Sequence, residues 1–449
     1  MGMGIKMQYK WPSLVTLIAL LLSLAACGPT APAPGVVSAA PADRPPQPKG
    51  TRISLRVGTG DSGEGLQPHR EIIARFEKEN PNIQVQVESV AGNDYYAQLL
   101  AEIAAGDAPD IMQVGDDAVP MFVQKGAFVE LGPFIKGQYP LDSQIYLPGV
   151  FDPGAWQGKQ YLLPKDFSPL AVYYNKKLFD RYNVPYPKDG WTWTDFLRTA
   201  QALTQDTDGD GRPDTWGVQL PAAWTTGFEY WVAAAGGELI SEDGAHFQGY
   251  MDSAAAVTAL QFYAELYGKY RVAPPPADMN AFGGGNTEFA DGRAAMLILG
   301  RWPESSLKKA PAVDLGLVGV PAGAQRANVL FWSGFGIYSG SPNREAAWRF
   351  LRFYAGEQGA EVWKDWGLPT VQSIAEAAGL TGDPIEGVWL RELGDLRPRA
   401  YVFTPRWGET ADPALRQALE KAILDPQADA ATLLKEAAQQ AQVALDGKK

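Results

Sequence analysis

The chain has 449 residues and a net charge of −12, and 11% of its residues are aromatic. The acidic balance argues against nucleic acid or anionic lipid as a ligand. Its single cysteine, Cys27, has no disulfide partner and no companion for a cysteine metal site. About 400 residues follow the N-terminal segments, which exceeds one compact core and predicts two lobes.

The N-terminus reads as an export signal followed by a tether. Residues 1–26 carry two lysines and an apolar run too short to span a bilayer, which predicts a signal peptide. The sequence LAACG at 24–28 resembles a bacterial lipobox and predicts lipidation of Cys27; a free thiol behind an ordinary signal is the alternative. Residues 27–50 are rich in proline, which predicts a semi-extended tether. Cleavage before Cys27 would remove two basic and no acidic residues, leaving a net charge of −14.

Strands and helices alternate in the next part of the chain. The apolar periodicity predicts strands at 52–57, 83–87 and 110–114 and helices at 68–79 and about 96–103. This alternation indicates an α/β fold with a mostly parallel sheet flanked by helices. Ligands of such sheets bind beyond the carboxyl ends of the strands. The candidate binding loops are therefore 58–65, with Asp61 and Ser62, and 115–120, with Asp116.

A central stretch, 158–204, contains two short extended runs joined by an ordered segment. The runs are 161–164 and 170–174, the segment 165–169 joins them, and 175–179 predicts a short turn. Residues 192–203 predict a helix that Thr192 caps, with Asp195 as the capping-box partner.

The rest of the chain repeats the mixture of strands and helices. Strands are predicted at 216–220 and 313–321, the latter leading to the segment 331–337, and helices at 224–235, 253–267 and 343–355. Residues 289–296 and 300–302 read FADGRAAM and GRW, and residues 331–337 read FWSGFGI.

These pieces resemble, in order, the extracellular solute-binding proteins of ATP-driven sugar importers, the family of maltose-binding protein. The resemblance lies in GKQYLLP at 158–164, YYNKKLF at 173–179, TWTDF at 192–196, and the segments at 289–302 and 331–355. It implies a type II periplasmic-binding-protein-like fold with three crossings between lobes, near 166–170, 330–334 and 366–369. The implied lobes are 51–166 with 333–366, and 167–332 with 367–449.

The resemblance also implies a function. It suggests a lipid-anchored, monomeric, non-enzymatic receptor, with no required cofactor, on the outer face of the cytoplasmic membrane. This receptor would bind a mono- or oligosaccharide between its lobes and deliver it to the membrane subunits of an ABC transporter. A binding protein for a glycerophosphodiester or peptide and a secreted glycoside hydrolase are the alternatives.

The chemistry of sugars selects the candidate ligand-binding residues. A sugar ring has an apolar C–H face that suits aromatic rings and a belt of hydroxyls that suits planar acceptors and donors. Such side chains on the predicted loops and crossings, together with one glycine of the second crossing, are Asp61, Ser62, Asp116, Asp166, Trp224, Glu229, Arg301, Trp302, Trp332, Gly334 and Trp366.

Two catalytic or cofactor motifs are disfavoured. The glycines of GTGDSG at 58–63 have dinucleotide-fingerprint spacing, but the helix is predicted to begin only near Pro68, too late for close packing against the third glycine. The GDS at 60–62 matches an esterase nucleophile block, yet His69 and His246 are the only histidines and neither lies near the C-terminus.

An acidic loop at 206–214 has the spacing of a calcium-binding loop. Asp206, Asp208, Asp210 and Asp214 supply oxygens at positions one, three, five and nine, and Arg212 could add its carbonyl at position seven. Position twelve is Gly217, where an EF-hand has glutamate. The loop predicts a structural calcium site, with a solvated acidic turn as the alternative.

Overall fold

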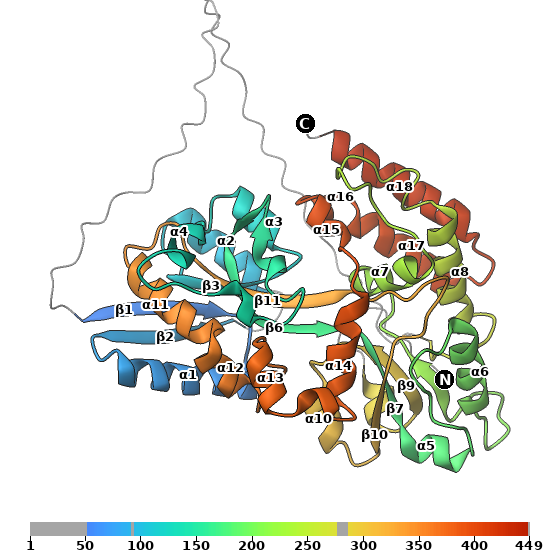
Figure 1. Cartoon of the computed structure of the whole chain (residues 1–449). Helices are drawn as coiled ribbons and strands as arrows, with labels where there is room; N and C mark the ends of the chain where they lie inside the picture. Colours follow the sequence, from blue (N-terminus) through green and yellow to red (C-terminus); the bar gives the residue numbers. More distant parts are fainter. Residues whose placement is uncertain (1–51, 91–93, 276–285, 448–449) are drawn as a thin grey trace, which may run out of the picture. The chain divides into compact units, whose positions relative to one another are not determined.

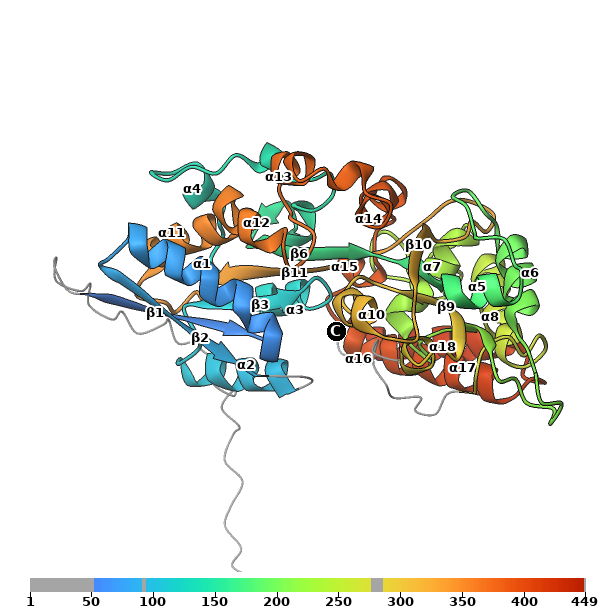
Figure 2. The same ribbon diagram turned by 90° about the horizontal axis from the view of Figure 1, so that it is seen from below.

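The computed structural model describes residues 52–90, 94–275 and 286–447. The predicted signal peptide, the tether and Cys27 lie outside these residues. Two sheets organise the described part of the chain, each with its own helices (Figures 1 and 2). A two-stranded ribbon and five short 3-10 helices lie beside them: β4 (Ala155–Trp156), β5 (Lys159–Gln160), η1 (Gly63–Gly65), η2 (Ser143–Ile145), η3 (Asp152–Gly154), η4 (Leu380–Gly382) and η5 (Leu393–Asp395).

The first sheet has the strand order β2-β1-β3-β11-β6. Its strands are β1 (Ile53–Thr59), β2 (Ile83–Ser89), β3 (Ile111–Gly115), β6 (Leu162–Pro169) and β11 (Leu330–Ile337). The pairings of β1 with β2 and β3 are parallel, and β11 is antiparallel to both of its neighbours. Four strands therefore run in one direction and β11 opposes them.

Helices cover both faces of the first sheet (Figure 2). Ile72 and Phe76 of α1 pack with Leu55 and α11 in one core cluster, and Leu99 and Phe122 of α2 and α3 belong to the other. Apolar residues at helical spacing supply these faces, and their burial drives the packing. The helices of this lobe are α1 (Leu66–Glu79), α2 (Asp94–Ala105), α3 (Val119–Gln124), α4 (Gly132–Ile135), α11 (Arg344–Ala355), α12 (Glu357–Trp363) and α13 (Gln372–Ala377).

The second sheet has the order β10-β7-β9-β8 and is also mixed. Its strands are β7 (Ala171–Asn175), β8 (Trp216–Gln219), β9 (Ala294–Leu299) and β10 (Leu315–Gly319). Only β7 runs against the others, because it is antiparallel to β9 and β10 while β8 and β9 are parallel. The helices of this lobe are α5 (Lys176–Arg181), α6 (Trp193–Leu203), α7 (Thr225–Ala234), α8 (Ala254–Tyr267), α9 (Thr287–Ala290), α10 (Glu304–Lys309), α14 (Glu386–Glu392), α15 (Ala400–Phe403), α16 (Trp407–Thr410), α17 (Asp412–Leu424) and α18 (Ala430–Asp446).

Two of the predicted crossings lie side by side, because β6 and β11 pair along their length. Trp332 opposes Phe167 and Ser333 opposes Asp166, and the register then slips so that Gly334 opposes Pro164. Lys165 is the residue passed over at this β-bulge, a feature that commonly re-aims a side chain. The segment 165–169, expected as a crossing between strands, is thus itself part of a strand.

The third crossing comes later than the sequence indicated. Gly367 lies near Arg301 of the second lobe, but the chain then stays with the first lobe. The carbonyl of Thr370 accepts from Leu147 N–H at 2.9 Å, and Val371 is buried in the first lobe's core. The chain therefore passes to the second lobe only between α13 and α14, and the predicted boundary at 366/367 is too early.

Two local sequence predictions, a capped helix at 192–203 and a turn at 175–179, can be compared with the structure. Thr192 caps α6, and the capping box with Asp195 is formed, as predicted. The short turn expected at 175–179 is instead the start of helix α5, which Asn175 caps. Among the described residues, no helix combines the length and the apolar character needed to cross a membrane.

Candidate functional site

A cavity of about 620 Å3 lies where loops of the two lobes meet. The first lobe contributes the loops after β1 and β3, and the second lobe contributes the start of α7 and the segment after β9. The cavity is lined by Gly60, Asp61, Tyr96, Gly115, Asp116, Asp117, Trp224, Thr226, Trp302, Phe331, Trp332, Arg399 and Tyr401. Five of the eleven predicted ligand-binding residues are among them: Asp61, Asp116, Trp224, Trp302 and Trp332.

Three aromatic rings form one side of the cavity. Trp224 and Phe331 stack with ring centroids 4.9 Å apart, and Trp302 meets both edge-on at 5.9 and 5.5 Å. The two tryptophans differ in exposure, since Trp224 is 6% exposed and Trp302 is 48% exposed. Trp302 therefore presents much of its ring to solvent at this site, whereas Trp224 presents mainly an edge.

Arg399 crosses behind these rings and is almost completely buried. Its guanidinium lies 4.5 Å from the Phe331 ring centre, and its Nη atoms donate to the carbonyls of Leu330 and Thr226 at 3.0 and 2.9 Å. Glu229 of α7 neutralises it across 3.2 Å. Glu229, predicted to contact ligand, does not line this cavity; it holds Arg399, which does.

Three buried polar groups on the cavity wall lack a hydrogen-bond partner. Among the described residues, no partner is present for Trp224 Nε1, Arg399 Nε or the Tyr401 hydroxyl. Buried polar groups are almost always hydrogen-bonded, because desolvation without a partner costs roughly 1–3 kcal/mol. Five other buried atoms of the described residues share this property elsewhere in the fold, so these three describe the packing of the wall behind the cavity.

Asp116 is half-buried at the end of β3, directly beside Trp332. Its carboxylate accepts from Trp332 N–H at 3.3 Å, and its own N–H donates to the Trp332 carbonyl at 3.0 Å. Burial raises the pKa of Asp116 to about 8, although the charge of Arg399 partly opposes this rise. At neutral pH the carboxyl group can therefore donate as well as accept hydrogen bonds.

Asp61 is held in place by a buried polar network. Its Oδ2 lies 2.9 Å from Lys165 Nζ and 2.7 Å from His69 Nε2. Burial opposes ionisation of Asp61, but Lys165 and His69 outweigh it and keep the pKa of Asp61 well below its usual range. The bulge in β6 aims Lys165 into this network, so the hinge strand itself fixes a side chain of the cavity.

The remaining first-lobe candidates lie outside the cavity lining. Ser62 is exposed at the cap of η1. Asp166 is bound by Lys165 at 2.5 Å and by the hydroxyl of Ser333 at 2.6 Å, which makes it part of the hinge. Gly334 is buried, and a Cβ there would come within 2.1 Å of the Trp332 ring. Its glycine is explained by this close packing.

Arg301 and Trp366 also lie outside the cavity lining. The Arg301 guanidinium is engaged by Glu386 of α14 at 3.0 and 3.1 Å, so its neighbour Trp302, and not Arg301, reaches the cavity. Trp366 is 44% exposed just after α12. Trp332 lines the cavity, yet only 4% of it is exposed, and its Nε1 donates to the Val150 carbonyl at 2.8 Å. It is therefore mainly a core residue.

Sequence reasoning missed several lining residues. Asp117 directly follows the predicted residue Asp116, and Phe331 directly precedes the predicted residue Trp332. Their positions in the sequence could therefore have identified them. Arg399 and Tyr401 lie far along the chain in a segment without a recognisable motif. Only the packing of this segment against α7 brings them to the cavity.

The acidic loop partly resembles the predicted ligand set. Carboxylate oxygens of Asp206, Asp208 and Asp210 all lie within 4.8 Å of one another. Asp214 is not in this group, because its carboxylate accepts from the Thr207 N–H at 2.7 Å. The three exposed carboxylates could hold a cation, and calcium there stays a prediction.

The fold and the cavity together are those of a two-lobed solute-binding protein. Residues 60–361, more than half of the chain, match the family model described as bacterial extracellular solute-binding protein. The chain belongs to this family. Membership makes the protein an extracytoplasmic, solute-binding component of a transport system.

Similar proteins agree with this fold. The structure of an ABC substrate-binding protein from Listeria monocytogenes in complex with cycloalternan has a TM-score of 0.76 and 27% identity, covering 87% of this chain and 98% of that chain. The structure of UgpB from Mycobacterium tuberculosis in complex with glycerophosphocholine has a TM-score of 0.76 and 21% identity, covering 88% and 99%. The galactooligosaccharide-binding protein of Bacillus subtilis is 23% identical over 384 residues, 82% of each chain.

Proposed function

We propose that the protein binds a carbohydrate in the cavity between its lobes and delivers it to an ABC transporter. The observation that carries this proposal is the cavity of about 620 Å3, in which the half-exposed Trp302 ring and the polar side chains of Arg399 and Tyr401 line one space. Asp61 and Asp116 add carboxyl groups to the same cavity. Sugar hydroxyls donate and accept at once, so they can satisfy both kinds of group.

The aromatic side of the cavity supports the same ligand class. The exposed ring of Trp302 offers a flat apolar surface to the C–H face of a sugar. Trp302 also lines a second hollow of about 440 Å3, together with Glu64 and Lys309 of opposite lobes. A ring that borders two hollows supports an oligosaccharide over a single sugar.

A glycerophosphodiester is the second candidate, because one structural neighbour was solved with glycerophosphocholine. A phosphate group would require cationic donors. Arg399 is the one basic residue lining the described cavity, and Glu229 already neutralises it. Asp61, whose pKa is lowered so that it stays ionised, would repel a phosphate, and its charge favours a sugar.

Three further features belong to the proposal. Lipidation of Cys27 would anchor a monomeric receptor at the outer face of the cytoplasmic membrane, and the tether would let it reach the transporter. The ligand would favour lobe closure through its higher affinity for the closed state. Binding would occur without turnover, and calcium in the acidic loop would have only a structural role.

The test is a thermal-shift screen of oligosaccharides, monosaccharides and glycerophosphocholine, followed by calorimetry on each hit. A raised Tm with a sugar and none with glycerophosphocholine is the expected result. The reverse pattern would replace the proposal by the second candidate. Chromatography of the recovered sugar checks for turnover, since shortened products would indicate a hydrolase.

A further inference from the structure

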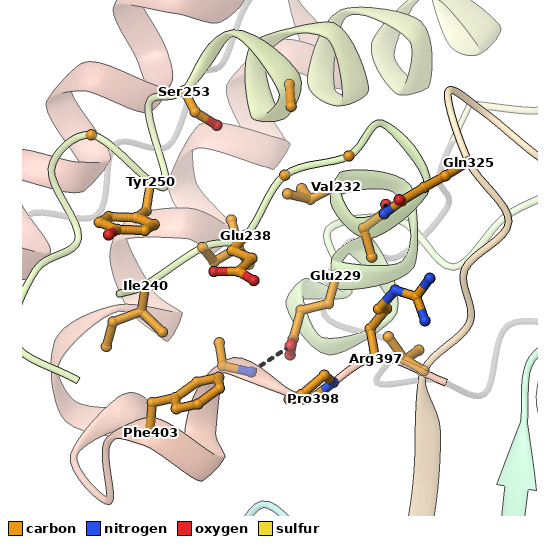
Figure 3. A pocket seen from close by; sticks show the side chains of 18 residues that line it. Glu229, Val232, Glu238, Ile240, Tyr250, Ser253, Gln325, Arg397, Pro398 and Phe403 are labelled. Carbon is orange, nitrogen blue, oxygen red and sulfur yellow. Dashed lines mark hydrogen bonds between the residues drawn. The ribbon is translucent and has the colours of Figure 1, made fainter. Parts of the chain in front are cut away.

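A separate pocket of about 350 Å3 lies within the second lobe (Figure 3). It is bounded by the end of α7, the start of α8 and the segment 397–403. Its apolar lining consists mainly of Val232, Leu239, Ile240 and Val329, each at most 3% exposed. The volume falls within the usual range of small-molecule sites.

Two carboxylates border this pocket. Glu229 is 6% exposed; its Oε2 accepts from Ala400 N–H at 2.8 Å, and its Oε1 accepts from Arg399 at 3.2 Å. Glu238 follows α7 and is exposed, and in the described part of the chain its carboxylate forms no ion pair. Figure 3 shows Glu229 on α7 and Glu238 on the loop that follows it, both among the side chains that line the pocket. Arg399 neutralises Glu229 and Arg397 adds a cation to the pocket lining, so Glu238 is the acid that forms no ion pair in the described part of the chain.

Most nearby hydrogen-bond donors are already used. The N–H groups of Gly236 and Gly237 donate to Ala233 and Val232 of α7 at 3.0 and 2.9 Å. The C-terminus of α7 therefore borders the pocket, and this end of a helix carries partial negative charge. The N-terminus of α8 borders it from the other side, where the Ser253 hydroxyl accepts from Ala256 N–H.

Arg397 adds a positive charge to the pocket lining but forms no ion pair with Glu238 in the described structure. Its Nη atoms donate to the carbonyls of Leu396 and Arg326 at 3.1 and 3.3 Å. In Figure 3 its guanidinium lies away from Glu238. The Glu238 carboxylate therefore remains an acceptor for a ligand that carries donors.

Two aromatic rings complete the site. Tyr250 is 36% exposed at the pocket, and Phe403 of α15 is half-buried; Figure 3 shows the two rings apart, with Ile240 between them. An ammonium group is attracted to the face of such rings by roughly 0.5–1 kcal/mol at exposed sites. Ring faces, unpaired acid and apolar floor are the three features that recognise a cation on a short hydrocarbon.

We propose that this pocket binds a small organic cation. Its ammonium group would lie between Glu238 and the Tyr250 ring, and its hydrocarbon part on the floor around Val232. The site is distinct from the sugar cavity, but the two share the Glu229–Arg399 ion pair, since Glu229 lines the pocket and Arg399 lines the cavity.

The test uses n-butylammonium as the probe and 1-butanol as its uncharged analogue, in ligand-observed NMR titrations of the purified protein. Butylammonium should bind measurably tighter than butanol. Glu238→Gln should weaken butylammonium binding about threefold to fivefold, the range expected for one exposed ion pair or cation–π contact. Tyr250→Ala should weaken it by a similar factor.

Controls separate this pocket from surface charge and from the sugar cavity. Glu242→Gln removes an exposed acid four residues from Glu238 that does not line the pocket, and should leave probe binding unchanged. Trp302→Ala should likewise leave probe binding unchanged. Glu229 is not a suitable test position, because its loss would leave Arg399 buried without a counter-charge. Equal binding of both probes, or normal binding by Glu238→Gln, would overturn the proposal.

Discussion

Trp302→Ala tests the sugar cavity most directly. Trp302 is 48% exposed and lines both hollows of the proposed site, so its removal deletes a ligand surface more than a core residue. Trp332 would be a poor choice, because it is 4% exposed and donates to the Val150 carbonyl. Truncating such a residue costs about 3–5 kcal/mol of stability and would confound any binding measurement.

The expected loss of affinity follows from the exposed area. A tryptophan buries about 150–250 Å2 when fully covered, so its exposed half offers roughly 75–125 Å2 to a ligand. A sugar that stacks on one face covers about half of that. At about 25 cal/mol per Å2 this gives roughly 1–1.6 kcal/mol, and an aromatic contact adds about 0.5 kcal/mol. The dissociation constant should therefore rise about tenfold to thirtyfold.

The assay is calorimetric titration with the sugar found by screening, together with unliganded melting curves. Trp366→Ala is the matched control, because Trp366 is 44% exposed yet outside the cavity lining. It should bind the sugar normally. Both variants should melt within a few degrees of the parent protein, since each ring is about half exposed.

Two results would refute the reasoning. If Trp302→Ala binds with parental affinity, the sugar does not rest on that ring. If Trp366→Ala loses affinity instead, the ligand lies nearer the predicted third crossing, and the cavity between Asp116 and Trp302 is not the site.

Three further predictions concern Asp116, the acidic loop and the anchor. Asp116 has a pKa of about 8 in the folded protein and an ordinary value near 3.8 when unfolded, so the folded state holds the proton more tightly. Stability should fall as pH rises from 5 to 8, by at most about 1.4 kcal/mol per pH unit from this group, and Asp116→Asn should remove that slope in unfolding titrations. A chelator should lower Tm and calcium should restore it, whereas Asp208→Ala should respond to neither; a parent protein equally unresponsive would leave only a solvated turn. Cys27→Ala should release the protein from membranes or leave its precursor unprocessed, and normal fractionation would exclude lipidation.

The sequence was most informative where a single local pattern determines the structure. The alternation in 83–87 and the capping box at Thr192 depend on neighbouring residues only, and both elements formed as expected. The pairing of β6 with β11 comes from the structure, and only the existence of crossings near 166–170 and 330–334 was anticipated. The bulge at Lys165 was not, since a register slip between strands about 170 residues apart leaves no trace in either strand alone.

The site was less predictable because its residues come from separated segments. Aromatic residues and acids at predicted loops identified Asp61, Asp116 and Trp302, but the same rule also selected Arg301 and Asp166, whose charges are engaged elsewhere. The sequence gives the chemical type of each side chain, but it does not show which other side chain that group pairs with. Which acids remain available to a ligand is decided by the ion pairs that the fold forms.

Arg399 shows why the last part of the site required the structure. Nothing around it in the sequence marks it as functional, yet it is held by Glu229, by the Leu330 carbonyl at the second crossing and by the Phe331 ring. Each of these partners lies at least 68 residues away, the shortest separation being that to Phe331. A movement of β11 during lobe closure would shift Leu330 and Phe331, two of the partners of Arg399, together.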